Sequence, residues 1–91
     1  MVLQPEMIAQ CMDVARRFHA TKLILFGSAL TKPESARDID LACEGVVGWD
    51  LFKMGAELEE VVSYPVDLVP LEECRFPQYI RTNGRVLYEA A

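Results

Sequence analysis

The chain has few of the residues that build metal clusters and disulfide frameworks, and it lacks a long apolar run. Its 91 residues include one histidine, His19, and three cysteines, Cys11, Cys43 and Cys74. The cysteines are odd in number and lack metal-ligand spacing, so we interpret them as free thiols in a reducing cytosol. No apolar run is long enough to cross a bilayer, and no secretory signal pattern opens the chain. We therefore expect a cytoplasmic protein with no membrane partner, and we assign His19 no role.

Positive charge is also scarce. Nine Lys and Arg residues stand against fourteen Asp and Glu residues, which gives a formal net charge of −5. Proteins that hold nucleic acids draw much of their affinity from Lys and Arg on phosphates. This chain has no basic stripe and no interleaving of basic and aromatic residues. We therefore do not expect nucleic acid to be the main partner.

Apolar residues are abundant, at 52% of the chain. This fraction argues against disorder and the length suits one hydrophobic core, so we expect residues 1–91 to form a single domain. The apolar excess also suggests that a partner protein covers part of the surface in an oligomer. Trp49 and Phe52 are the candidates for this surface, because both residue types are frequent at interface centres. The alternative is that both belong to the core.

Two aspartates one residue apart carry the strongest chemical signal. Asp38 and Asp40 lie in an apolar segment that we interpret as a strand, where residues i and i+2 share a face. Two carboxylates at this spacing repel each other, and a hard divalent cation such as magnesium would relieve the repulsion. The alternative is two ordinary charges at a solvent-facing strand end.

A third carboxylate lies at the centre of another short apolar segment, residues 65–70. Asp67 is flanked there by Val66 and Leu68, although Asp is depleted in strands. If the two strands are neighbours, Asp38, Asp40 and Asp67 converge on one metal site, which would suit displacement at phosphorus with two metal ions. The alternative is an edge-strand charge that discourages aggregation.

Gly27 and Ser28 supply a possible phosphate site. They follow the apolar segment 23–26, where glycine permits a tight turn and close approach of a ligand. We predict that Ser28 caps a helix start whose outward amide groups bind phosphate. The alternative is a simple strand-to-helix turn.

The periodicity predicts an α/β (α+β) fold, a small sheet flanked by helices. Helices are expected over residues 5–19, 50–62 and 77–82, the last ending at a cap formed by Asn83 and Gly84. Strands are expected over residues 23–26, 38–43 and 66–69. Residues 30–35 are expected to form a loop or a broken helical turn.

This order of motifs resembles the nucleotidyltransferases related to DNA polymerase beta, and the length resembles their minimal nucleotidyltransferase (MNT) branch. The resemblance extends from about residue 23 to the end of the chain and implies a sheet of mixed direction. It implies that Gly27 and Ser28 bind nucleotide phosphates. It also implies that Asp38, Asp40 and Asp67 are catalytic and hold the metal ions, with Mg²⁺ as the ion and ATP as the nucleotide donor.

The resemblance to MNT proteins also implies a partner. In that family the MNT protein often acts as an antitoxin that transfers AMP to a tyrosine hydroxyl of a HEPN-domain toxin. Two alternatives remain, a small-molecule nucleotidyltransferase and a catalytically weak module that neutralises a partner by binding. The family often has an arginine directly after the Gly-Ser pair, where this chain has Ala29 and Leu30.

Overall fold

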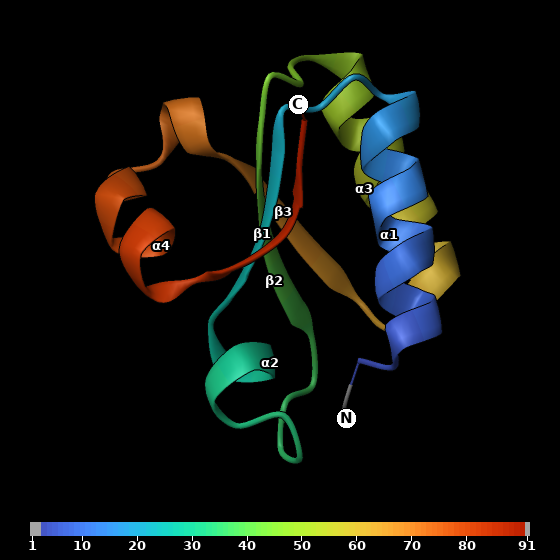
Figure 1. Cartoon of the computed structure of the whole chain (residues 1–91), viewed down its shortest axis with the longest axis vertical. Helices are drawn as coiled ribbons and strands as arrows, with labels where there is room; N and C mark the ends of the chain where they lie inside the picture. Colours follow the sequence, from blue (N-terminus) through green and yellow to red (C-terminus); the bar gives the residue numbers. More distant parts are fainter. Residues whose placement is uncertain (1–2, 91) are drawn as a thin grey trace.

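The computed structural model describes residues 3–90 as helices packed around one sheet (Figure 1). The helical elements are α1 (Pro5–Arg17), α2 (Ser28–Thr31), α3 (Trp49–Val62), the 3₁₀ turn η1 (Leu71–Glu73) and α4 (Pro77–Asn83). The strands are β1 (Lys22–Phe26), β2 (Ile39–Glu44), β3 (Val66–Pro70) and β4 (Arg85–Glu89). Among residues 3–90, no helix is long and apolar enough to span a membrane.

The sheet is mixed, with strand order β3-β2-β1-β4. Strand β1 runs antiparallel to both of its neighbours, and β2 runs parallel to β3. A parallel pair needs a crossover connection, which α3 provides between β2 and β3. In Figure 1, α1 and α3 lie on one face of the sheet, α4 lies on the other, and α2 lies beyond one end. The predicted fold class is confirmed.

Each face of the sheet has its own hydrophobic cluster. Leu23 and Leu25 of β1 join the larger cluster with α1 and α3, whereas Ile24 between them joins a smaller cluster with Ile80 of α4. This alternation follows from the two-residue period of a strand. A Cβ at Gly84 would collide with the side chain of Ile24, so glycine lets the chain pass closely over β1 from α4 to β4.

Several boundaries differ from the sequence prediction. Helix α1 ends at Arg17 rather than at residue 19, because His19 has a positive φ of 61° that closes the turn. Residues 28–31 are helical, so part of the expected loop is α2. Strand β4 was not predicted, although its pairing with β1 completes the sheet. Gly84 follows α4 as predicted but has an extended backbone with φ of −79°.

The three cysteines form no disulfide among the described residues, as expected. Cys11 and Cys43 are buried and Cys74 is partly buried. Burial raises the pKa of the Cys11 thiol to about 11, and burial together with nearby Glu72 raises that of Cys43 to about 12. Both thiols are therefore protonated at neutral pH and serve as small apolar core residues.

Candidate active site

Two of the three predicted carboxylates meet through the register of the sheet. Asp40 is the second residue of β2 and lies opposite Phe26 of β1 on one side and Asp67 of β3 on the other. Because neighbouring residues in register share a face, both carboxylates belong to the face that α4 covers. Both line one cavity on that face. Strand pairing alone therefore brings Asp40 and Asp67 together.

The third carboxylate lies just outside the strand. Strand β2 begins at Ile39, not at residue 38 as the sequence predicted, so the exposed Asp38 precedes it. Burial raises the pKa of the Asp40 carboxyl, and the charges of Asp38 and Asp67 raise it further. A carboxylate shifts the pKa of another in this way only at short range. All three negative charges are therefore concentrated around Asp40.

The donor chemistry of this cluster suits magnesium. As the side chains stand, residues 3–90 contain no group of three or more Asp, Glu, His or Cys with the arrangement of a metal site. The oxygen ligands of Asp38, Asp40 and Asp67 are nevertheless those that a hard divalent cation prefers. Burial and, after it, repulsion from Asp38 and Asp67 raise the pKa of Asp40, and such a cation would relieve the repulsion. The residues present fit the ion, and the metal site remains a prediction.

Gly27 directly follows β1 and lies against the carboxylate of Asp40. Its backbone has a positive φ of 73°, which glycine adopts without strain. A Cβ at this position would also collide with the carboxylate of Asp40. Both the turn and the close approach of Asp40 therefore require glycine here.

The helix start differs from the prediction that Ser28 is its cap. Gly27 is the N-cap of α2, Ser28 is the first helical residue, and no side chain caps the helix. The first amide groups of a helix have no acceptor within it, so the turn still offers backbone donors to an anion. Ala29, where the family often has arginine, is only 7% exposed and packs in the core. Position 29 therefore supplies no positive charge to a phosphate.

Two neighbouring cavities open on this side of the molecule. The first, the carboxylate cavity, has a volume of about 470 Å³ and is lined by Asp40 and Asp67 together with Arg75 and Phe76. The second, the turn cavity, has a volume of about 370 Å³ and lies over the Gly27–Ser28 turn. Three residues line both cavities: Phe26, Tyr79 and Ile80. A single extended ligand can therefore occupy both.

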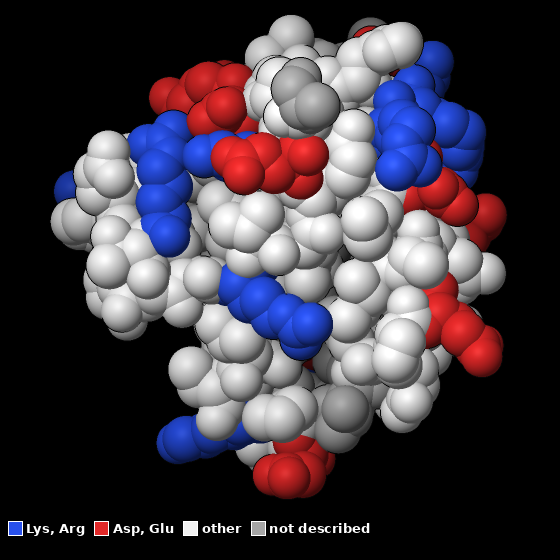
Figure 2. All heavy atoms as spheres, viewed as in Figure 1, with Lys and Arg blue, Asp and Glu red and all other residues white. Residues whose placement is uncertain are grey.

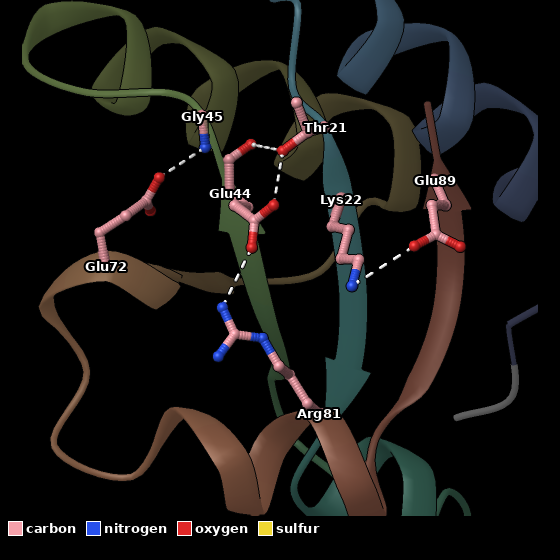
Figure 3. A network of polar contacts seen from close by, with 7 residues as sticks. All are labelled: Thr21, Lys22, Glu44, Gly45, Glu72, Arg81 and Glu89. Carbon is pink, nitrogen blue, oxygen red and sulfur yellow. Dashed lines mark hydrogen bonds and ion pairs between the residues drawn. The ribbon is translucent and has the colours of Figure 1, made fainter. Parts of the chain in front are cut away.

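Helix α4 forms a wall of both cavities, and a polar network fixes it to the sheet (Figure 3). Arg81 of α4 forms an ion pair with Glu44 of β2, at 3.1 Å from Nη2 to Oε2. Glu44 also accepts a hydrogen bond of 2.9 Å from the hydroxyl of Thr21. Nearby, the carboxylate of Glu72 accepts a hydrogen bond of 2.7 Å from the amide of Gly45. The wall of the site is thus tied to the far ends of β1 and β2.

Sequence reasoning missed the site residues contributed by α4 and the segment before it. Arg75, Phe76 and Tyr79 line the carboxylate cavity, and the two aromatic side chains are 71% and 68% exposed. The sequence predicted this helix but not the face of the sheet on which it lies. The available signal was the aromatic pair itself: Phe76 is the N-cap of a short helix and Tyr79 lies in its first turn.

The fold is that of a nucleotidyltransferase, as the resemblance predicted. Residues 10–86 match the nucleotidyltransferase domain family, so the chain belongs to that family. A search of curated proteins finds no match.

Solved structures with a similar fold come from toxin–antitoxin complexes. One chain from a crystal structure of a toxin–antitoxin with AMP-PNP is 21% identical to this chain. The match covers 91% of this chain and 73% of that chain, with a TM-score of 0.76. A chain of the MntA–HepT complex is 20% identical, with 96% and 74% covered and a TM-score of 0.73. A chain from the complex of a tri-AMPylated Shewanella oneidensis HEPN toxin with an MNT antitoxin is 21% identical, with 97% and 74% covered and a TM-score of 0.73. At these identities the likeness shows the fold.

Proposed function

We propose that this protein transfers AMP from ATP to a hydroxyl group of a HEPN-domain partner, as the antitoxin of a toxin–antitoxin pair. The observation that carries the proposal is the concentration of three carboxylates around Asp40, beside the glycine turn at Gly27. Membership of the nucleotidyltransferase family supports the reaction class. The AMP-PNP and tri-AMPylated HEPN complexes of the structural neighbours support the donor and the partner.

In this mechanism the residues mainly position the reactants and neutralise charge. Asp38, Asp40 and Asp67 would hold magnesium, which supplies charge neutralisation at the phosphates when bound. The backbone amide groups of the Gly27–Ser28 turn bind the phosphate chain. The acceptor hydroxyl attacks the α-phosphorus, its proton is released, and the bond to the leaving pyrophosphate breaks.

The partner surface predicted from sequence is exposed in the structure. Trp49 is 77% exposed and Phe52 is 72% exposed, so the alternative that both are core residues is wrong. Their rings touch edge to face with centroids 5.9 Å apart, and Val47 beside them is 67% exposed. Large exposed aromatic residues are frequent anchors of protein interfaces. We propose that Val47, Trp49 and Phe52, called the α3 patch below, contact the HEPN partner.

The α3 patch also supports a second candidate, a module that neutralises its partner by contact alone. The patch lies on residues 47–52 and includes none of the three carboxylates, so binding need not involve catalysis. Buried Ala29 at the position of the common family arginine agrees with weak catalysis. The two candidates differ in whether the carboxylates are needed.

Three further properties complete the proposal. We propose that residues 1–91 form one domain; the single sheet that carries both hydrophobic clusters within residues 3–90 supports this, and we expect one cooperative melting transition. The protein acts in the cytoplasm within a hetero-oligomer. Nucleic acid is not its main partner; on the face drawn in Figure 2 the basic side chains are scattered among acidic and neutral ones.

Calorimetric titration with ATP and MgCl₂ tests the nucleotide site. Wild-type protein should bind ATP more tightly with magnesium than without it, and Asp40→Asn should lose that difference. Asp50→Asn is the matched control, because Asp50 is an exposed aspartate in the first turn of α3. Equal magnesium-dependent binding by folded Asp40→Asn and wild type would overturn the assignment of the carboxylates.

A further inference from the structure

The carboxylate cavity has two aromatic side chains on its wall that packing does not explain. Phe76 and Tyr79 line it with 71% and 68% of their surfaces exposed. Isolated exposed aromatic residues are common on protein surfaces. Here, however, two of them lie on the wall of a cavity that is also lined by Asp40 and Asp67. Their position suggests that they contact a ligand of the same site.

The two cavities adjoin, because Phe26, Tyr79 and Ile80 line both of them. The turn cavity lies over the Gly27–Ser28 turn, where amide donors suit the phosphate chain. The carboxylate cavity continues from it past Tyr79, which lines both. A nucleotide whose phosphates lie at the turn and whose α-phosphate lies by Asp40 therefore extends its nucleoside into the carboxylate cavity. That cavity, at about 470 Å³, is the larger of the two.

The chemistry of the cavity wall differs between its parts. Asp40 and Asp67 provide negative charge for metal-bound phosphate, and Arg75 is the only Lys or Arg that lines this cavity. Arg75 forms no ion pair within the described part of the chain. The remaining wall is mostly apolar and aromatic, the kind of surface on which a flat nucleobase stacks. Such a surface offers no favourable contact to a phosphate chain, whereas a base can stack on it.

We propose that Phe76 and Tyr79 form the nucleobase subsite, on which the adenine of ATP stacks. This inference rests on the proposed function, since it assumes that the carboxylates receive the phosphates of a nucleotide. The subsite is held in place before the ligand arrives. Arg81 ties α4 to Glu44, and the Asn83 side-chain amide donates to the carbonyl of Tyr79 at 3.1 Å. Ile80 anchors the same helix in the smaller hydrophobic cluster.

The test compares ATP with inorganic tripolyphosphate, which has the phosphate chain but no base. Affinities are measured by calorimetry with MgCl₂ for wild type, Phe76→Ala and Tyr79→Ala. Each alanine variant should lose about tenfold in affinity for ATP, since a stacked base contributes roughly 1–3 kcal/mol. Neither variant should change in affinity for tripolyphosphate. Tyr79→Phe keeps the ring and should bind ATP as wild type does.

Tyr64→Ala is the matched control, because Tyr64 is an exposed aromatic residue that lines neither of the two cavities. It should leave both affinities unchanged. Unchanged ATP affinity in folded Phe76→Ala and Tyr79→Ala overturns the subsite, and so does an equal loss for ATP and tripolyphosphate. In the first case the aromatic pair contacts a protein partner instead. If wild type binds ATP with magnesium and both alanine variants bind it equally well, the subsite alone is wrong; if wild type does not bind ATP, the proposed function fails as well.

Discussion

At the scale of single residues, Asp40 is the centre of the site. It lies between Phe26 and Asp67 in the sheet, and the negative charge of Asp38, just before the strand, acts on its carboxyl group. Its pKa is raised, so its ionised form costs folding free energy at neutral pH. A charge retained at such a cost is typical of a functional site.

The first prediction concerns this cost in the protein without ligands. A group with a raised folded pKa adds stability below its unfolded pKa and loses that contribution as pH rises through the folded value. At pH 7 the contribution of Asp40 is lost, so Asp40→Asn should melt at a higher temperature than wild type. Asp50→Asn should melt no higher, because an acidic residue at a helix start is favourable. Magnesium should stabilise wild type but not Asp40→Asn; the reverse pattern in a thermal melt would contradict the account.

The second prediction compares the two residues of the glycine turn. Gly27→Val introduces both a strained positive φ and a collision with Asp40, so it should lower stability and abolish measurable ATP binding. Ser28→Ala should change ATP affinity by less than about fivefold, since one side-chain hydrogen bond contributes roughly 1 kcal/mol and the amides remain. Calorimetry on the folded variants measures both ATP affinities. A larger loss for Ser28→Ala would show that the side chain, not the backbone, binds the phosphate.

At the scale of elements, helix α4 forms a wall of the candidate site. It covers the face that carries Asp40 and lines both cavities. Its connection to the sheet runs through Glu44, to which Arg81 and Thr21 both donate hydrogen bonds. The aromatic pair is therefore positioned by residues at the opposite end of β2.

The third prediction tests this connection through its pH dependence. The hydrogen bonds from Thr21 and Arg81 hold the pKa of Glu44 below its ordinary value of 4.5. A lowered pKa gives stability that is present above pH 4.5 and lost as pH falls through the folded value. Glu44→Gln should therefore lower the free energy of unfolding by about 1 kcal/mol at pH 7 and by less at pH 3. Urea unfolding at both pH values measures this.

Glu60→Gln is the control for that experiment, because Glu60 is an exposed glutamate of α3. It should change stability little at either pH. An equal effect of Glu44→Gln at pH 7 and pH 3 would mean that the ionised form of Glu44 does not hold α4.

The helices and strands also show which features of the fold can be predicted from the sequence. The first three strands were predictable because each is a short apolar run, and α1 and α3 were predictable because their buried residues recur at helical spacing, as Met54, Leu58 and Val62 do in α3. The meeting of Asp40 with Asp67 was expected as well, since two neighbouring strands with a period of two align their side chains. Local pattern was enough for these features.

The missed features depend on long-range packing. Strand β4 has only Leu87 buried, so its sequence gives little alternation, and pairing with β1 creates the strand. The exposure of Phe76 and Tyr79 follows from the face of the sheet that α4 covers, which helix periodicity does not specify. The start of β2 at Ile39, and hence the position of Asp38 outside it, depends on pairing with β3.

At the scale of the whole molecule, the proposed catalytic surface and the proposed partner surface are separate. The cavity lined by Asp40 and Asp67 lies beside α4, whereas the α3 patch lies in and just before the first turn of α3. Figure 1 shows α3 and α4 on opposite faces of the sheet. A partner that contacts the α3 patch must therefore extend around the molecule to bring its hydroxyl to Asp40.

The fourth prediction separates the two surfaces. Trp49→Ser or Phe52→Ser should weaken the complex with the HEPN partner by about tenfold or more, as expected for central aromatic anchors. Neither should change ATP affinity, because neither residue lines the carboxylate cavity. Val86→Thr, an exposed apolar position on β4, is the control and should retain the partner. Co-purification and calorimetry measure the two properties; an undiminished complex in both serine variants would place the interface elsewhere.

The most direct test of the central claim is the mass of the partner. The protein is incubated with ATP, MgCl₂ and a HEPN-domain protein encoded beside it, and the intact mass of that protein is measured. We predict that AMP is added with wild type and with Glu60→Gln, a change at an exposed residue outside the α3 patch, and that none is added with Asp38→Asn or Asp40→Asn. A partner that is neutralised equally by all four proteins and gains no AMP would contradict the claim and identify a binding module.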